Sequence, residues 1–315
     1  MKLDKKKLSQ GVKILGYILT VASLVFLVKY FIDNKDSMAI LLDPGALLVT
    51  VALGAFVTIS VFLNAFTWKR SLEIFTPSKL PVIPIYCLFA KANMGKYIPG
   101  NVMQYVSRNI IGKDYNLDQK QMALSTVIEL IVKVAVAALM TLVLSFDRLF
   151  FTVSNAVSDG ALSLWLVVAV LVGGCAVVVG MIVYFIRLNR KQKLNFRKLF
   201  AVALYTAGFY AINMIAFILT LLLLNGGLGG YDPFMLSGYY LIAWFIGFIT
   251  PGAPSGIGIR EYVMLLLFVP MFPQSVILAA MIVNRVISTL GDVFAYLITF
   301  VFHKKLKTMK GRNIA

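Results

Sequence analysis

Six apolar runs in this chain are each long enough to cross the hydrocarbon core of a bilayer, and they constrain the fold more than any other feature of the sequence. A core of roughly 30 Å requires about 20 consecutive apolar residues in a helix. Hydrophobic residues make up 60 % of the 315 residues and charged residues only 14 %, so most of the chain is suited to lipid. The sequence predicts an all-α, polytopic membrane protein with a single integral membrane domain over residues 1–315. The six expected spans are residues 14–32, 44–66, 121–146, 161–186, 199–224 and 275–302.

Two further stretches break this pattern in the same way. Residues 81–109 centre on a Pro-Gly break at Pro99 and Gly100, and residues 234–273 centre on a second break that begins at Pro251 and Gly252. Paired hydrophobic segments that Pro and Gly interrupt at corresponding positions of two halves are typical of a transporter's binding site. Irregular backbone at membrane depth survives only when it is buried in protein or lines a wet cavity. We therefore expect two re-entrant segments that meet near the midplane.

The basic residues predict the orientation of the spans. The net charge is +17, and the cations gather at residues 2–13, 69–79, 187–198 and 304–312, beside the ends of apolar runs. Such clusters mark cytoplasmic loops, with attraction to anionic headgroups as a secondary effect. Both termini are thus expected in the cytoplasm. Nucleic acid is not an expected partner, because folded readers with a basic patch need a soluble domain.

The same assignment predicts an internal repeat. Each half reads span, span, broken segment, span, and Pro99-Gly100 corresponds to Pro251-Gly252. The first half starts inside and the second starts outside, so we expect an inverted repeat with halves of about 1–146 and 147–315.

Three carboxylates are expected at membrane depth, and each has a cation near it in sequence. Lys133 follows Glu129 by four residues, Arg260 adjoins Glu261, and Arg285 precedes Asp292 by seven. Spacings of four and seven put both partners on one helical face. Adjacent residues such as Arg260 and Glu261 point in different directions on a helix, so at least one of them is expected to find a partner elsewhere. An ionisable residue at the membrane centre costs about 2.5–3.5 kcal/mol on insertion scales, so these groups are expected to face the bundle interior. They either fix the packing of helices as internal salt bridges or line a polar path.

The second break has the composition of a phosphate site. Gly252, Gly256 and Gly258 let backbone N–H groups converge before a helix that is expected to begin near Ile259, and Arg260 adds a cation. A structural bend is the alternative interpretation.

The first break offers comparable chemistry. Lys96, Asn101, Gln104 and Arg108 lie there, the last three on one face if helical. The alternative is an interfacial helix whose long cationic side chains reach the headgroups. We expect Trp244 to serve in packing. The remaining candidates for the headgroup site or transport path are Tyr97, Pro99, Gly100, Pro251, Ser255 and Asn284.

The sequence argues against cofactor and metal chemistry. With one histidine, at position 303, a His-based triad or multi-histidine metal site is excluded. The phosphate-loop pattern Gly-x-x-x-x-Gly-Lys-Ser/Thr does not occur, so we expect no ATP hydrolysis. Ser107 and Ser255 have no His as a supporting base. No cofactor, metal or catalytic residue is therefore predicted.

Two motifs resemble a known family. They are GKYIPGNV at residues 95–102 with Arg108, and TPG at 250–252 followed by GIGIRE at 256–261. On these motifs the chain resembles the integral-membrane flippase region of the lysylphosphatidylglycerol synthase family, of the multiple peptide resistance factor type, over nearly its whole length. The resemblance implies a bacterial plasma-membrane protein that carries an aminoacylated phospholipid, or a related lipid, to the outer leaflet. Such transport lowers the surface charge that attracts cationic antimicrobial peptides. After residue 302 only a short basic tail follows, so the lysyltransferase activity of the family's soluble domain is not expected here.

Our leading hypothesis is therefore a lipid flippase. Its arginines, Arg108, Arg260 and Arg285, would bind phosphate, and one of the three embedded carboxylates would bind a cationic headgroup. The alternatives are an enzyme that acts on lipid, a membrane subunit of a phosphatidylglycerol lysyltransferase, and a noncatalytic component of cell-envelope polysaccharide assembly. The phospholipid is the expected partner, and a separate lipid-modifying enzyme and a homo-oligomer are left open.

Overall fold

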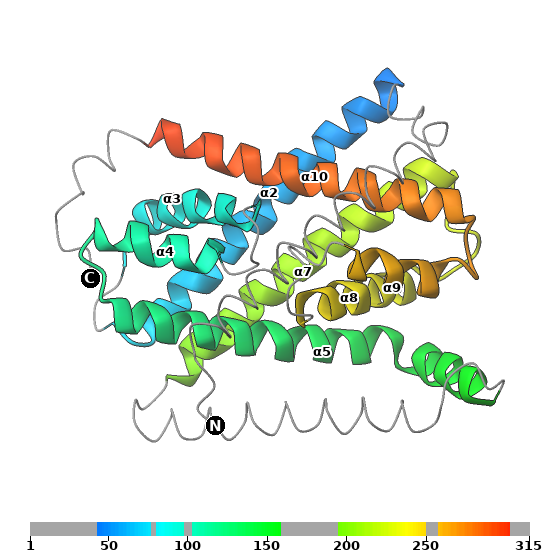
Figure 1. Ribbon diagram of the computed structural model, residues 1–315, viewed down its shortest axis with the longest axis horizontal. Coiled ribbons are helices and arrows are strands. Elements are labelled where there is room, and N and C mark those ends of the chain that lie inside the picture. The colour runs from blue at the N-terminus through cyan, green and yellow to red at the C-terminus, as the bar shows by residue number, and fades with distance from the viewer. Residues whose placement is uncertain (1–42, 77–79, 98–102, 159–194, 250–257, 303–315) are drawn as a thin grey trace, which may run out of the picture.

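The described part of the chain is helical throughout. The computed structural model describes residues 43–76, 80–97, 103–158, 195–249 and 258–302, and these residues contain no strand. The all-α prediction is confirmed for them. The elements are α2 (Pro44–Glu73), α3 (Val82–Asn93), the 3-10 helix η2 (Met94–Tyr97), α4 (Met103–Lys113), α5 (Gln119–Ser158), α7 (Phe196–Asn225), α8 (Pro233–Ile249), α9 (Ile259–Phe268) and α10 (Gln274–Val301) (Figure 1).

Four of these helices are long and apolar enough to cross a membrane. They are α2, the Gln119–Ser145 part of α5, α7 and α10. They correspond to the expected spans 44–66, 121–146, 199–224 and 275–302. The other two expected spans, residues 14–32 and 161–186, lie outside the described residues.

In the part of the chain that the structure describes, short helices flank each break. The first break follows α3 and η2 and precedes α4, and the second follows α8 and precedes α9. The breaks themselves, at residues 98–102 and 250–257, lie outside the described residues. Helix α9 begins at Ile259, where the sequence predicts it. The entry of these stretches into the bilayer from opposite sides stays a prediction.

Local chemistry explains where the long helices begin and end. Asp43 accepts a hydrogen bond from the Ala46 N–H at 2.9 Å and Pro44 follows it, which is a favourable helix start. Helix α7 ends at Gly226, whose φ of 67° suits glycine. Helix α2 continues beyond the apolar run because Glu73 forms ion pairs with Lys69 at 2.5 Å and Arg70 at 2.9 Å. These cations therefore belong to the helix rather than to a loop after it.

The described helices have an order and contacts that are consistent with the expected repeat, and the matched long helices run in opposite directions. In Figure 1, α2 and α10 end on the left side of the molecule, where α5 and α7 begin. Helix α2 thus runs opposite to α7, and α5 opposite to α10. If α2, α3, α4 and α5 are matched with α7, α8, α9 and α10, contacts correspond too: α2 packs on α10 as α7 packs on α5, and α3 packs on α10 as α8 packs on α5. These ends are the ones that the basic clusters predict to be cytoplasmic.

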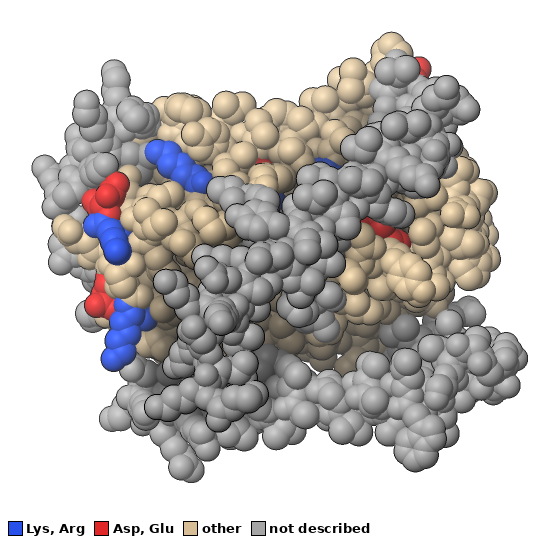
Figure 2. Space-filling view, in the orientation of Figure 1, with Lys and Arg blue, Asp and Glu red and all other residues tan. Residues whose placement is uncertain are grey.

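The two halves pack closely where α2 crosses α10. A side chain on Gly54 would place its Cβ 2.7 Å from Leu290, and one on Gly291 would place it 3.0 Å from Val57. Small residues at such a crossing let two helix backbones approach inside a membrane. Most of the described surface on the face in Figure 2 carries no charge, and charged side chains gather mainly at its left edge, where those helix ends lie.

Candidate functional site

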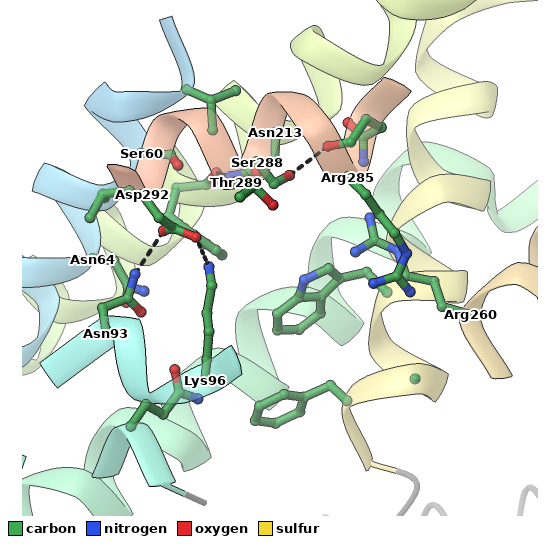
Figure 3. Close-up of a pocket in the computed structure, with 18 of the residues that line it drawn as sticks. Ser60, Asn64, Asn93, Lys96, Asn213, Arg260, Arg285, Ser288, Thr289 and Asp292 are labelled. Atoms are coloured by element: carbon green, nitrogen blue, oxygen red, sulfur yellow. Dashed lines mark hydrogen bonds and ion pairs between the residues drawn. The ribbon is translucent and has the colours of Figure 1, made fainter. Parts of the chain in front are cut away.

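A polar cavity of about 210 Å³ lies where both broken stretches meet the long helices (Figure 3). Helices α2, α5, α7 and α10 form much of its wall, and α3, η2, α4, α8 and α9 complete it. Segments of both halves therefore contribute, as expected for a binding site at a repeat interface. Its lining side chains are Val57, Ser60, Val61, Asn64, Asn93, Lys96, Tyr97, Gln104, Tyr105, Lys133, Phe209, Asn213, Tyr240, Trp244, Phe248, Arg260, Asn284, Arg285, Ser288, Thr289 and Asp292.

Asp292 marks one end of this cavity, where three groups of the first broken stretch hold it. Asn93 donates its Nδ2 to Oδ1 at 2.7 Å, and the Tyr97 hydroxyl donates to Oδ2. The Lys96 ammonium forms an ion pair with the same Oδ2 (Figure 3). Lys96 remains 28 % exposed, whereas Asp292 is 2 % exposed. Helix α10 is thus fixed to α3 and η2, which precede the first break.

Arg285 and Glu261 form an ion pair near the other end. The Arg285 Nε donates to Glu261 Oε1 at 2.7 Å, and its Nη2 contacts the same oxygen. The other carboxylate oxygen of Glu261 accepts the Gly258 N–H at 2.7 Å. Gly258 has φ 87°, a conformation that suits glycine. One N–H of the expected anion-binding turn is therefore already used within the chain.

Among the described cations that line the cavity, Arg260 is the one without a carboxylate partner in the described residues. Its Nη2 atom is buried without a hydrogen-bond partner there, and its guanidinium lies 4.8 Å from the centre of the Tyr240 ring. Figure 3 places its side chain beside that of Arg285. Two guanidinium groups side by side favour an anion with several acceptor oxygens, such as phosphate.

A third charged cluster lies deeper, between α4 and α5. Glu129 accepts Arg108 Nη1 at 2.6 Å and Lys133 Nζ at 2.6 Å. Arg108 is covered by aromatic rings, with the ring centre of Phe89 4.4 Å from its Cζ and that of Tyr105 at 5.1 Å. Lys133 reaches the cavity lining, but Arg108 and Glu129 do not.

The three charged groups together leave an excess of positive charge. Among the described residues they hold five cations, Lys96, Arg108, Lys133, Arg260 and Arg285, against the carboxylates Glu129, Glu261 and Asp292, which leaves two positive charges over. Each carboxylate already has a cation of the chain as its partner. The site is therefore built for an anion.

The candidate residues fall into three groups. Those that line the cavity are Lys96, Tyr97, Gln104, Lys133, Arg260, Asn284, Arg285 and Asp292. Those that lie beside it, in ion pairs or at the start of α9, are Arg108, Glu129, Gly258 and Glu261. Those outside the described residues are Pro99, Gly100, Asn101, Pro251, Gly252, Ser255 and Gly256.

Of the three carboxylates, Glu129 has the partner that its spacing predicts, Glu261 has a partner on another helix as adjacency to Arg260 suggests, and the expected partner of Asp292 is wrong. Lys133 does pair with Glu129, since four residues on one helix bring them together. Glu261, however, pairs with Arg285 of α10 rather than with its neighbour Arg260, because adjacent helical residues point in different directions. Asp292 pairs with Lys96 rather than with Arg285, although both α10 residues line the cavity.

Several lining residues were not among the candidates. Ser60 and Asn64 lie inside the apolar run of α2, and Asn213 lies inside that of α7. Their polarity within a span is a usable signal, because polar groups in lipid are costly unless they face the bundle interior. Trp244, expected in packing, stacks on Phe248 at 5.0 Å and also lines the cavity.

Comparison of the sequence with models of protein families finds no matching family, and comparison with curated protein sequences finds no matching relative. The resemblance to the lysylphosphatidylglycerol synthase family thus rests on its two motifs, and the geometry of the cavity carries the functional argument.

Proposed function

We propose that this chain is a flippase-like lipid transporter that binds the phosphate of a lipid headgroup in the central cavity and moves the lipid between leaflets. The observation that carries the proposal is Arg260, a cation without a carboxylate partner in the described residues, in a cavity with excess positive charge between both broken stretches. A cation at membrane depth is costly without a counter-charge, and a phosphate supplies one together with several acceptor oxygens.

Transport fits the cavity better than catalysis does. Ser107, one of two candidate nucleophiles, is not among the residues that line the cavity, and Ser255 lies outside the described residues. The lining hydroxyls that are described have no imidazole beside them, and the lining carboxylate there, Asp292, already holds Lys96, Asn93 and Tyr97. A headgroup held between two halves, by contrast, is the arrangement that alternating access requires.

The structure supports binding of a lipid phosphate by arginines better than it supports binding of a cationic headgroup by carboxylates. Two of the three arginines assigned to phosphate, Arg260 and Arg285, line the cavity, and Arg108 is sealed against Glu129. All three carboxylates proposed for a cationic headgroup already hold cations of the chain. The proposed cargo is therefore a lipid phosphate, and an aminoacylated headgroup would have to displace Lys96 or Arg285 from its acid.

Reconstitution into liposomes tests the proposal. A fluorescent phospholipid is quenched from outside by a membrane-impermeant reductant, so the fraction that becomes quenched reports transfer between leaflets. We expect Arg260→Gln to slow transfer roughly 10-fold or more, because a charge-assisted hydrogen bond contributes about 1.5–3 kcal/mol. The control is Arg197→Gln, which removes an exposed cation at the start of α7. Absence of transfer by the parent protein would refute the flippase and favour a noncatalytic envelope component.

A further inference from the structure

Neutral polar side chains form a wall of the cavity, which runs from the Arg285 end to the Asp292 end. Ser60 and Asn64 come from α2, Asn213 from α7, and Ser288 and Thr289 from α10 (Figure 3). Residues 60 and 64 are four apart, and residues 285, 288 and 292 of α10 follow one helical face, so each helix presents its polar groups toward the cavity. The site therefore offers Asn213, Ser288 and Thr289 between Asp292 and Arg285, and Ser60 and Asn64 beside Asp292.

This wall contains a hydrogen-bond acceptor that nothing in the described residues satisfies. The Asn64 Oδ1 atom is buried and lacks a partner there. A buried acceptor in a native site normally has a donor. An ionised phosphate cannot be that donor, because its oxygens only accept. In a bound phosphate ester the donor would be another group of the ligand, and a hydroxyl, which both donates and accepts, can hydrogen-bond to either the oxygen or the nitrogen of an amide.

An amine is a poor match for the same place. Asp292 is the one carboxylate that lines the cavity within the described ranges, and Lys96, Asn93 and Tyr97 already occupy its oxygens.

A quaternary ammonium is no better matched, although aromatic rings can hold one. The chain's own cations already lie against two of the lining rings, with Arg260 at 4.8 Å from the centre of Tyr240 and Lys133 at 5.9 Å from that of Phe209. A second positive charge would also add to the existing excess.

The cavity has room for more than a phosphate. Its volume of about 210 Å³ compares with roughly 10–15 Å³ for one water on the same measure. A phosphate at Arg260 and Arg285 leaves space for several further heavy atoms along Asn64, Asn213 and Ser288.

We infer that the headgroup is a phosphate ester of a polyol or sugar, with its phosphate on Arg260 and Arg285 and its hydroxyls on the wall formed by Ser60, Asn64, Asn213, Ser288 and Thr289. This inference rests on the proposed function and specifies the chemical class of its cargo. Neutral hydroxyl donors distinguish such a lipid from one with an ethanolamine or choline headgroup.

Binding of soluble headgroup analogues to the detergent-solubilised full chain tests this inference. The matched probes are glycerol 1-phosphate and ethyl phosphate, which carry the same phosphate monoester with and without hydroxyls, and phosphoethanolamine. Titration calorimetry is expected to give at least 10-fold tighter binding of glycerol 1-phosphate than of either other probe. In Asn64→Leu this preference should fall to about 2-fold while ethyl phosphate binds as before, whereas Arg260→Gln should weaken both phosphate esters.

The outcomes separate this inference from the proposed function. Equal binding of glycerol 1-phosphate and ethyl phosphate by the parent protein would overturn the hydroxyl site and leave phosphate recognition intact. Tighter binding of phosphoethanolamine would overturn it in favour of an amine site. If none of the three probes binds, phosphate recognition and the hydroxyl site both fail. The parent protein alone decides these cases, so they do not depend on the folding of a variant.

Discussion

The α4–α5 and α9–α10 interfaces occupy corresponding places in the two halves, and each holds an arginine–glutamate ion pair with the charges exchanged. Arg108 lies on α4 and Glu129 on α5, whereas Glu261 lies on α9 and Arg285 on α10. The first pair is sealed, with side-chain exposures of 2 % and 0 %. In the second pair Arg285 is 28 % exposed and lines the cavity, while Glu261 is 6 % exposed.

The difference has a local cause. Around the first pair, Lys133 supplies a second cation to Glu129, and Phe89 and Tyr105 cover the Arg108 guanidinium. Around the second pair, the Arg285 side chain faces the cavity instead of a cover of aromatic rings. The Arg108–Glu129 pair is therefore buried and holds α4 against α5, whereas the corresponding Glu261–Arg285 pair is part of the candidate binding site. The sealed pair should govern stability and the open pair transport.

The largest expected effect is the loss of stability in Glu129→Gln. This change leaves Arg108 and Lys133 buried without their carboxylate, and breaking a buried pair costs about 3–5 kcal/mol. The thermal unfolding of the detergent-solubilised protein can be followed by tryptophan fluorescence, because Trp68 lies 5.3 Å from the Arg108 guanidinium. The matched change Glu261→Gln should cost clearly less, since Arg285 can reach water in the cavity. Equal losses in the two variants would contradict the contrast between sealed and open pairs.

A second prediction concerns the partners at the open end of the site. Residues in contact show coupling of about 0.5–3 kcal/mol, whereas independent sites add within about 0.3–0.5 kcal/mol. In a double-mutant cycle on the free energy of unfolding, Lys96→Gln with Asp292→Asn should be coupled. Arg285→Gln with Asp292→Asn should be nearly additive, because these two residues hold different partners. Strong coupling in the second cycle alone would restore the pairing that the sequence spacing suggested.

The sequence predicted those features of the structure that depend on residues close together in the chain. The apolar runs predicted the four described long helices, and the spacing of four predicted the Glu129–Lys133 pair. The spacing of seven failed for Asp292, and adjacency left the partner of Glu261 open; both partners come from other helices. Such contacts depend on how helices are placed against one another, which the periodicity of one helix does not contain. Asn64 and Asn213 were not predicted although their polarity within apolar runs is a signal, because a single polar residue in a span does not show which neighbouring helix or cavity it faces.

The smallest expected effects come from two tyrosine hydroxyls, one at each kind of site. Tyr97 donates to Asp292 at the open cavity, and Tyr210 donates to the Lys133 carbonyl at 3.1 Å beside the sealed cluster. Each change to Phe removes one hydrogen bond, with a typical net contribution of about 0.5–1.5 kcal/mol. Asp292 keeps Lys96 and Asn93, so Tyr97→Phe should unfold nearly like the parent protein.

The two variants should differ in transport rather than in stability. Tyr97→Phe changes a group that lines the cavity and frees Lys96 and Asp292 to shift, so lipid transfer between leaflets should fall several-fold. Tyr210 does not line the cavity, and the Lys133 backbone remains in α5, so Tyr210→Phe should transfer lipid at the parental rate with a slightly lower unfolding temperature. The liposome assay and the fluorescence melt, applied to both variants, measure these two quantities separately. A transport defect in Tyr210→Phe that matches the one in Tyr97→Phe would mean that the sealed cluster also moves during transport, and the division between support and site would then be wrong.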